Sequence, residues 1–361
     1  MKYGLISDTH FHNWKQFATV DDRGVNSRLL IQLSENYRIA ERMAQAGCKH
    51  LFHAGDCFHV RGSIAPSVLN PVLSTYTRIV NELGMTIHMI PGNHDLETND
   101  SRVMTNASTA LRDIGVNVYV DEAMVDLDTD HSVLVVPWKS NVGALRSFLS
   151  QRVRLYANPD LIDVIIHAPV NGIIKGIPDH GLEVSELAQL GFRRVFAGHY
   201  HNHKVFPAGA HGGAVCSVGA LALQPWGHIG SIAGGVIAES DGQILHIPTS
   251  APLFIDVNSG WQSEEEAKQE VKGNYVRVKL PIEEESEVEE MREFLTQLGA
   301  LAVAVHPVRK PKNNARKSTV NTSVTLRQSV DEYIQQQDNY GDKQRLSVLC
   351  AEIMEAADAV Q

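Results

Sequence analysis

The sequence predicts an α/β fold in which helices cover a central sheet, and three features of the chain support this prediction. Short apolar runs rich in Val and Ile alternate with helical patterns over the first 200 residues. Each run ends at a polar position that holds Asp or His. With 361 residues, 43% of them hydrophobic, the chain has the length of about two domains and enough apolar side chains to bury a sizeable core.

The apolar runs are expected to be buried strands, because short Val- and Ile-rich segments bounded by Gly, Pro or Asp are typical of strands. These strands are expected at residues 3–7, 49–54, 86–90, 163–166 and 194–197. Helical spacing of apolar residues predicts helices over residues 27–46, 66–83 and 184–190. Each helix stops before a glycine (Gly47, Gly84 or Gly191), the residue preferred just after a helix. Residues 217–257, rich in Gly and β-branched residues, are expected to add strands that close the sheet.

The chain changes character near residues 250–259. Residues 263–272 are charged and are expected to form a linker, and a strand (275–280), a helix (283–298) and a strand (301–305) follow as a β-α-β unit. The glutamates of that helix are expected to form a solvated face. We therefore expect a main domain over residues 1–257, a capping domain over 258–308, and a basic linker with a helical tail over 309–361.

The tail contains two features that each allow two interpretations. Residues 309–317 hold five basic side chains in nine positions, and they could touch phosphates or form a solvated linker. Residues 343–360 form an amphipathic helix, which could dock in a groove of a partner or pack on its own domain.

Charge and composition exclude several classes of protein. With 32 Lys and Arg against 42 Asp and Glu, the net charge of −10 excludes a protein that coats nucleic acid through bulk charge, but not an enzyme that touches DNA locally. No apolar run approaches the ~18 residues that span a membrane, and the N-terminal run is too short for a secretory signal. We therefore expect a cytoplasmic protein without a membrane partner. The cysteines lack the spacing of a metal or disulfide framework (Cys48, Cys57, Cys216 and Cys350).

The polar clusters at the strand ends are expected to form one metal centre, because sites in α/β folds lie beyond the carboxyl ends of the strands. Two pairs of donors lie two residues apart, Asp8 with His10 and His199 with His201, so each pair can face one side of its strand. Asp56 follows Gly55, and its two carboxylate oxygens can bridge two cations. The predicted ligands are Asp8, His10, Asp56, Asn93, His167, His199 and His201.

Two divalent cations that share Asp56 would each have about four ligands from this set. Nitrogen and oxygen donors without a thiolate suit Mn, Fe or Zn better than Ca, and Mn²⁺ is the expected ion. Two such ions about 3.5–4 Å apart form a clamp for in-line displacement at phosphorus. His94 could act as an acid or base, with Asp95 bonded to its ring to fix the tautomer.

Three residues near these motifs remain open from the sequence. His59 could reach the metal centre or cap the helix that follows it. A lone histidine after a strand, such as His167, is more often structural than a ligand. Cys57 stands beside a predicted ligand, but a small buried apolar residue is the more common role of such a cysteine.

The order of the motifs, DxH, GDxxH, GNHD, H and GHxH, resembles that of the calcineurin-like metallophosphoesterase superfamily, whose fold is a β-sandwich flanked by helices. Three features are similar to those of the nuclease subunits of SbcCD-type double-strand-break repair complexes. They are GDCFH at residues 55–59, VPW at residues 136–138, and the C-terminal β-α-β unit, which resembles a capping domain. Cys57 replaces a usual Leu, and the polar stretch over residues 11–26 is long for this branch.

The resemblance also implies a role for each site residue. Asp8, His10, Asp56 and His201 would hold one metal, and Asp56, Asn93, His167 and His199 the other. His94 would protonate the leaving oxygen, and His59 would help to place the phosphate. The implied partners are DNA, an SbcC-type coiled-coil ATPase and a second copy of the chain.

The expected function is a two-metal-dependent DNA nuclease, an exonuclease or endonuclease in DNA repair or recombination. The alternative is a small-molecule phosphodiesterase or protein phosphatase that uses the same metals, since fold and metals do not fix the substrate. A non-catalytic scaffold is disfavoured, because such proteins usually lose ligands and none is missing here.

Overall fold

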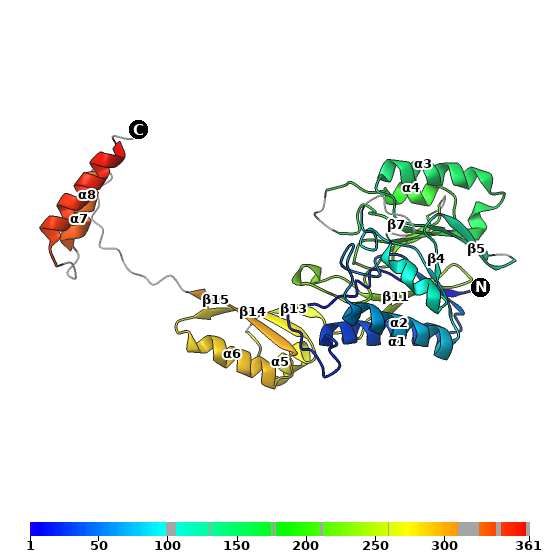
Figure 1. Cartoon of the computed structure of the whole chain (residues 1–361), viewed down its shortest axis with the longest axis horizontal. Helices are drawn as coiled ribbons and strands as arrows, with labels where there is room; N and C mark the ends of the chain where they lie inside the picture. The colour runs from blue at the N-terminus through cyan, green and yellow to red at the C-terminus, as the bar shows by residue number, and fades with distance from the viewer. Residues whose placement is uncertain are drawn as a thin grey trace. The chain divides into compact units, whose positions relative to one another are not determined.

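The computed structural model describes residues 1–98, 106–129, 131–174, 176, 178–209, 212–258, 260–309, 325–336 and 341–358. The chain divides into two compact units, Met1–Val308 and Arg309–Gln361 (Figure 1). Apart from Arg309, the basic strip predicted at residues 309–317 lies outside the described residues. In the described part of the chain, no helix has both the length and the apolar character needed to cross a membrane.

The first large sheet has six strands in the order β12-β11-β1-β2-β3-β4. The neighbours from β1 to β4 pair in parallel, whereas β11 and β12 join as antiparallel strands at the other edge. The strands are β1 (Tyr3–Ile6), β2 (His50–His53), β3 (Thr86–Met89), β4 (Asn117–Val118), β11 (Gly234–Ala238) and β12 (Ile244–Pro248).

The second large sheet also has six strands, in the order β5-β6-β7-β8-β10-β9. Its four central strands are parallel, and antiparallel strands form both edges. The strands are β5 (Ala123–Asp128), β6 (His131–Val136), β7 (Ile162–His167), β8 (Arg194–Gly198), β9 (Lys204–Phe206) and β10 (Ala214–Ser217).

Helices cover the outer face of each large sheet (Figure 1). The helices α1 (Ser27–Gln45) and α2 (Pro66–Leu83) pack on the first sheet, and α3 (Val142–Arg152) and α4 (Val184–Gln189) pack on the second. Asn26 caps α1 by accepting hydrogen bonds from two backbone N–H groups, and left-handed Gly84 ends α2 as predicted. Short 3₁₀ helices lie at Ala107–Ile114, Val153–Leu155, Pro159–Leu161 and Trp226–His228.

Alternate residues of the central strands pack in different hydrophobic cores. Leu5 and Phe196 pack in the layer between the two sheets, whereas Ile6 packs with α1 and α2, and Val195 packs with α3 and α4. Both faces of these strands are therefore buried, which explains why the sequence shows continuous apolar runs instead of alternation.

The expected β-sandwich flanked by helices is confirmed, but the expectation of one central sheet from the apolar runs was wrong. The five predicted strands divide between two sheets, with three in the first and two in the second. Strands buried on both faces have the same sequence pattern in either sheet, so the pattern cannot assign them. The prediction also omitted β4, β5, β6, β9, β10 and α3.

A third sheet of three strands, in the order β13-β14-β15, completes the first unit. The strand β13 pairs in parallel with β14, so this sheet begins before residue 258. Two helices accompany its strands, which confirms the predicted strand-helix-strand order. The elements are β13 (Phe254–Val257), α5 (Glu264–Val271), β14 (Tyr275–Ile282), α6 (Ser286–Gln297) and β15 (Ala302–Arg309).

The prediction of a linker at residues 263–272 was wrong, because α5 occupies this segment. Ser263 caps the helix, its first turn carries three glutamates, and Ala267 and Val271 are buried. Acidic side chains at a helix N-terminus interact favourably with its dipole, so the charge that suggested a linker stabilises the helix. In the second unit, α7 (Leu326–Gln336) and α8 (Lys343–Asp358) pack together, and α8 falls where a helix was predicted.

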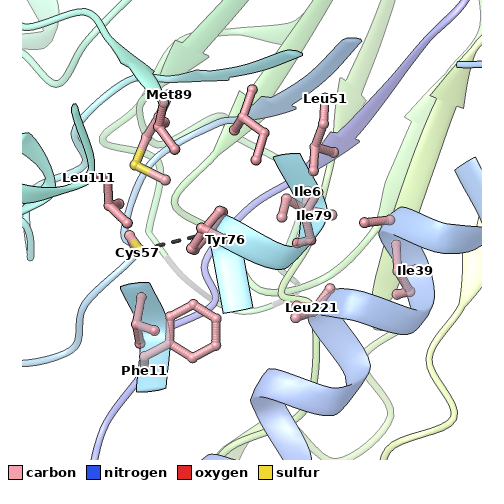
Figure 2. Close-up of a cluster of buried hydrophobic side chains, with 14 of the residues drawn as sticks. Ile6, Phe11, Ile39, Leu51, Cys57, Tyr76, Ile79, Met89, Leu111 and Leu221 are labelled. Atoms are coloured by element: carbon pink, nitrogen blue, oxygen red, sulfur yellow. Dashed lines mark hydrogen bonds between the residues drawn. The ribbon is translucent and has the colours of Figure 1, made fainter. Parts of the chain in front are cut away.

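The core between the first sheet and its helices contains Cys57. Figure 2 shows its thiol beside the hydroxyl of Tyr76, to which it donates a hydrogen bond at 4.0 Å. Burial, followed by the charge of Asp95, raises the pKa of this thiol well above its usual value. Cys57 is therefore the small buried residue that the sequence favoured.

Candidate metal centre

The polar segments that follow five parallel strands meet at one end of the sandwich. Asp8 and His10 follow β1, Asp56 follows β2, and Asn93 follows β3. In the second sheet, His167 ends β7, and His199 and His201 follow β8. The structure thus brings all seven predicted ligands together. Among the described residues, three groups have donor atoms within 4.8 Å of one another. Two consist of predicted ligands, namely Asp8, His10 and His201, and Asp56, His167 and His199, and the third joins His10 to His59 and His94.

The first group surrounds Asp8. His201 Nε2 lies 3.6 Å from Asp8 Oδ1 and 3.0 Å from His10 Nε2. His10 Nε2 in turn lies 3.6 Å from Asp56 Oδ2. The Asp56 carboxylate therefore borders this group.

The second group surrounds the other side of Asp56. His167 Nε2 lies 3.4 Å from Asp56 Oδ2 and 3.2 Å from Asn93 Oδ1. His199 Nδ1 lies 3.0 Å from the same Asn93 oxygen. Asp56 thus stands between the two groups, where a bridging ligand would be needed.

The spacing and chemistry of these donors fit divalent cations. Ligands about 2.1 Å from an ion are roughly 3.0 to 3.4 Å apart in octahedral or tetrahedral geometry, which is close to the separations found here. The set comprises four imidazoles, two carboxylates and one amide oxygen, without a thiolate. Such a mixed nitrogen and oxygen set suits transition metals better than calcium.

Backbone strain is concentrated in the segments that carry the donors. Among the described non-glycine residues, five have positive φ, and four of these are the predicted ligands Asp8 (51°), His10 (44°), Asp56 (58°) and His199 (99°). Such conformations are costly for residues other than glycine and persist where the surrounding fold enforces them. The prediction that strand alternation aims Asp8 and His10 was wrong, because β1 ends at Ile6 and left-handed turns aim both side chains.

Glycines leave the space that the donor side chains fill. A Cβ on Gly92 would lie 2.1 Å from Asp56 Oδ1, and one on Gly55 would lie 2.3 Å from His167 Nδ1. A Cβ on Gly198 would lie 2.8 Å from the same His167 atom. Larger residues at these positions would displace the ligands.

Hydrogen bonds hold several rings with one nitrogen facing the centre. His167 Nδ1 donates to the carbonyl oxygen of Ala54 at 2.7 Å, which leaves Nε2 as the donor atom toward Asp56. His201 Nδ1 lies 3.0 Å from His228 Nε2, and His201 Nε2 faces Asp8. Metal-binding histidines commonly have such a partner on the other nitrogen.

Burial and charge shift the titration of these groups. Burial raises the pKa of Asp8 to about 6, although the charge of His167 opposes this shift. Burial would lower the pKa of His167, but the facing Asp56 carboxylate raises it to about 9. Burial lowers the pKa of His199 to about 3 and that of His201 to about 4, so both rings are neutral at pH 7 and able to bind a cation.

His94 lies at the centre, but its partner differs from the prediction. Its Nδ1 donates to the carbonyl oxygen of His59 at 2.7 Å, and its ring centroid lies 4.8 Å from that of His10. The Asp95 carboxylate instead accepts from the backbone N–H groups of Gly92, Phe58 and Cys57. The expectation that Asp95 fixes the tautomer of His94 is therefore corrected, because Asp95 is committed to the turns that carry Asp56 and Asn93.

His59 also belongs to the centre. Its Nδ1 lies 3.4 Å from His10 Nδ1, and its ring stacks on that of His94 with centroids 5.5 Å apart. The residue that caps α2 is Ala65, so His59 is not the cap that the sequence left open.

The sequence analysis missed residues that surround the ligands. Trp138 stacks on His199 with centroids 5.3 Å apart, and its backbone N–H donates to the carbonyl of Pro91. His228 holds His201, and the rings of His12 and Trp14 lie against His59. Trp138 lay in the VPW segment and His12 and Trp14 lay in the polar stretch over residues 11–26, but the contacts of these rings with the ligands were not predicted.

Comparisons with known proteins agree with this geometry. The family model described as "Calcineurin-like phosphoesterase" matches residues 1–203. Over 194 residues the chain is 26% identical to "Exonuclease subunit 1" of Enterobacteria phage T4, a match that covers 52% of this chain and 53% of that protein. The chain therefore aligns with about half the length of that relative.

Two solved structures have a low overall similarity to the chain. A dimetal phosphatase from Danio rerio has 10% identity and a TM-score of 0.40, over 66% of this chain and 91% of that chain. Vps29 complexed with Zn²⁺ from Entamoeba histolytica has 12% identity and a TM-score of 0.30, over 67% and 88%.

Proposed function

Since the chain belongs to the calcineurin-like phosphoesterase family, we propose that it is a two-metal-dependent nuclease that hydrolyses phosphodiester bonds of DNA. The observation that carries this proposal is the place of Asp56, whose Oδ2 lies 3.6 Å from His10 Nε2 and 3.4 Å from His167 Nε2. One carboxylate between two groups of donors is the arrangement that a pair of neighbouring divalent ions requires.

We propose that the ligands divide between two metal sites, a division that the distances between the donor atoms support. Asp8, His10, Asp56 and His201 would hold one ion, and Asp56, Asn93, His167 and His199 the other. Mn²⁺ is the ion we propose, and nitrogen and oxygen donors without a thiolate suit it better than Ca²⁺. When bound, such a pair supplies a water of lowered pKa and neutralises charge on the phosphoryl oxygens.

His94 is the proposed proton donor to the leaving oxygen. Because Nδ1 is committed to the carbonyl of His59, Nε2 is the nitrogen left to carry the proton toward the substrate. General acid catalysis of this kind accelerates a reaction typically ~10²–10⁴-fold. His59, stacked on His94 and half-buried, would donate a hydrogen bond to the phosphate and so help to orient it.

DNA is the proposed substrate because the T4 relative is named an exonuclease subunit. That name also supports assembly with another subunit, for which we propose a coiled-coil ATPase of the SbcC type. The second unit offers a surface for such a partner, since α7 and α8 expose apolar side chains. They are Leu326, Tyr333, Val348, Leu349 and Ile353. We also propose that the chain forms a homodimer and acts in repair or recombination. The capping domain, expected over residues 258–308, would also include β13, which pairs with β14.

A comparison of substrates tests the function. Linear duplex DNA, single-stranded circles, bis(4-nitrophenyl) phosphate and a phosphopeptide would be incubated with the full chain in Mn²⁺, Mg²⁺ or EDTA. We expect the DNA substrates to be cleaved in Mn²⁺ and left intact in EDTA. Turnover of the small diester alone would identify a small-molecule phosphodiesterase, and turnover of the phosphopeptide alone would identify a protein phosphatase; either result would reject the nuclease.

A further inference from the structure

Aromatic rings lead from the metal centre to the protein surface. The ring of His59 lies 5.3 Å from that of His10 and 4.6 Å from that of Trp14, centroid to centroid. His12 completes this rim, at 5.1 Å from His59 and 5.4 Å from Trp14. Trp14 is thus two ring contacts away from a predicted metal ligand.

The backbone explains why these rings lie side by side. Phe11 and Phe58 form an isolated bridge in which the Phe11 N–H donates to the carbonyl oxygen of Cys57. The residues that follow them, His12 and His59, therefore leave neighbouring segments together. A tight turn, in which the Trp14 N–H donates to the carbonyl oxygen of His12, then returns the indole to His59.

The indole is held in a fixed position. Its Nε1 donates to Gln32 Oε1 at 3.2 Å, so its polar edge is satisfied by the protein. The Arg28 guanidinium lies 5.2 Å from its ring centroid, and Arg28 donates to the carbonyl oxygens of Gln16 and Gln224. A ring fixed in this way loses little conformational entropy when it binds a ligand.

Trp14 nevertheless remains accessible in an electropositive setting. His12, Trp14 and His59 are half-buried, and Lys15 is exposed. Lys15 directly follows Trp14 in the chain, so its charge lies near the rim. Aromatic faces beside basic side chains are the combination that binds single-stranded nucleic acid, because bases stack while cations attract the backbone.

From this arrangement we infer that His12 and Trp14 form a stacking site for an unpaired nucleobase beside the reacting phosphate. The inference rests on the proposed nuclease function and specifies it further: a nucleotide next to the cleaved bond leaves the base stack and lies on the indole. Since every base has an aromatic face, the site would tolerate any sequence.

Binding of a short oligonucleotide tests the stacking site apart from catalysis. Fluorescein-labelled single-stranded 12-mers, intact or with one abasic position moved along the strand, would be titrated with the full chain in EDTA. Stacking is worth roughly 1–3 kcal/mol per base, so Trp14→Ala should weaken binding about 10-fold and Trp14→Phe by less than about 3-fold. Trp261→Ala is the matched control, because Trp261 lies beside Phe294 in the third sheet's core, and it should leave binding unchanged.

The abasic series identifies the partner of Trp14. For the wild-type chain, one abasic position should weaken binding about 10-fold, and for Trp14→Ala that position should add no further loss. Equal abasic penalties in both proteins would overturn the stacking site. A flat series in the wild type would overturn it by itself, even if Trp14→Ala proved unstable. The abasic series and the cleavage assay test separate proposals. If the wild-type chain cleaves DNA in Mn²⁺ but shows a flat series, the nuclease proposal stands and the stacking site is rejected. If it fails to cleave DNA, the nuclease proposal is rejected.

Discussion

Asp56 Oδ2 and His167 Nε2 lie 3.4 Å apart, although Asp56 follows a strand of the first large sheet and His167 ends a strand of the second. Both side chains are buried. Each proposed site therefore takes side chains from both sheets, since His201 in one and His167 and His199 in the other come from the second sheet. The proposed centre is complete only when the two sheets pack together.

Removal of the proposed acid should depend on the leaving group. His94→Asn should lower kcat for DNA by about 10²–10⁴-fold, because a sugar oxygen needs a proton as it leaves. The same variant should lose much less activity on bis(4-nitrophenyl) phosphate, whose phenolate leaves without protonation. Steady-state kinetics on both substrates measure this difference, and metal content by mass spectrometry should be unchanged. An equal loss on both substrates would remove His94 from proton transfer.

A single methyl group at Gly92 should disrupt the centre. Gly92→Ala would place its Cβ 2.1 Å from Asp56 Oδ1 and 2.4 Å from the Asp56 backbone nitrogen, so the bridging carboxylate must move. We expect Mn²⁺ affinity measured by calorimetry to fall at least about 10-fold, in the range found when ligand orientation is lost. Gly260→Ala is the matched control, since a Cβ there meets nothing within 4 Å. Unchanged Mn²⁺ binding in Gly92→Ala would show that Asp56 does not bridge.

His228 should act on the metal through His201. His201 Nδ1 lies 3.0 Å from His228 Nε2, so loss of His228 frees the His201 ring to rotate. His228→Ala should weaken binding of one Mn²⁺ about 10–100-fold, as other losses of such partners do. His228→Gln, which retains a hydrogen-bonding group, should recover much of this affinity. A Gln variant as weak as the Ala variant would contradict the orienting role.

The burial of His88 predicts that the protein loses stability in acid. It is buried, with Nε2 3.0 Å from His50 Nδ1 and Nδ1 2.9 Å from the Tyr119 hydroxyl. Burial, and then the charge of His50, lowers its pKa from 6.5 to about 4. Between these values the unfolded chain takes up the proton, so the contribution of His88 is complete above pH 6.5 and declines as the pH falls toward 4.

Denaturant unfolding at several pH values measures this effect. The free energy of unfolding of the wild type should fall by about 2 kcal/mol more than that of His88→Gln between neutral pH and about pH 4.5. The exposed His180 supplies the control variant His180→Gln, which should follow the wild type. Parallel pH profiles of the wild type and His88→Gln would show that His88 does not carry this dependence.

The candidate ligands could be grouped from the sequence because each comes at or just after the end of a strand that the apolar runs revealed. Parallel strands end at one edge of a sheet, so Asp56 and Asn93 could be expected to meet without knowledge of the sheet order. The division of the strands between two sheets could not be predicted, since Leu5 and Val195 belong to runs of the same kind yet lie in different sheets. The site was predictable despite this error because the strand ends of both sheets lie at the same end of the sandwich.

Contacts between distant segments could not be predicted from the sequence. The partner of His94 is a backbone carbonyl, which any residue at position 59 would provide, so no sequence signal marks it. The charged pattern of α5 resembled a linker because only two of its residues are buried. Trp14 and His228 reach the centre through tertiary packing from segments with no motif of their own.

Anomalous diffraction from crystals grown with Mn²⁺ would test the central claim most directly. The account predicts two manganese peaks about 3.5–4 Å apart, one beside Asp8, His10 and His201 and the other beside Asn93, His167 and His199, with the Asp56 carboxylate between them. A single peak, or peaks remote from Asp56, would contradict it.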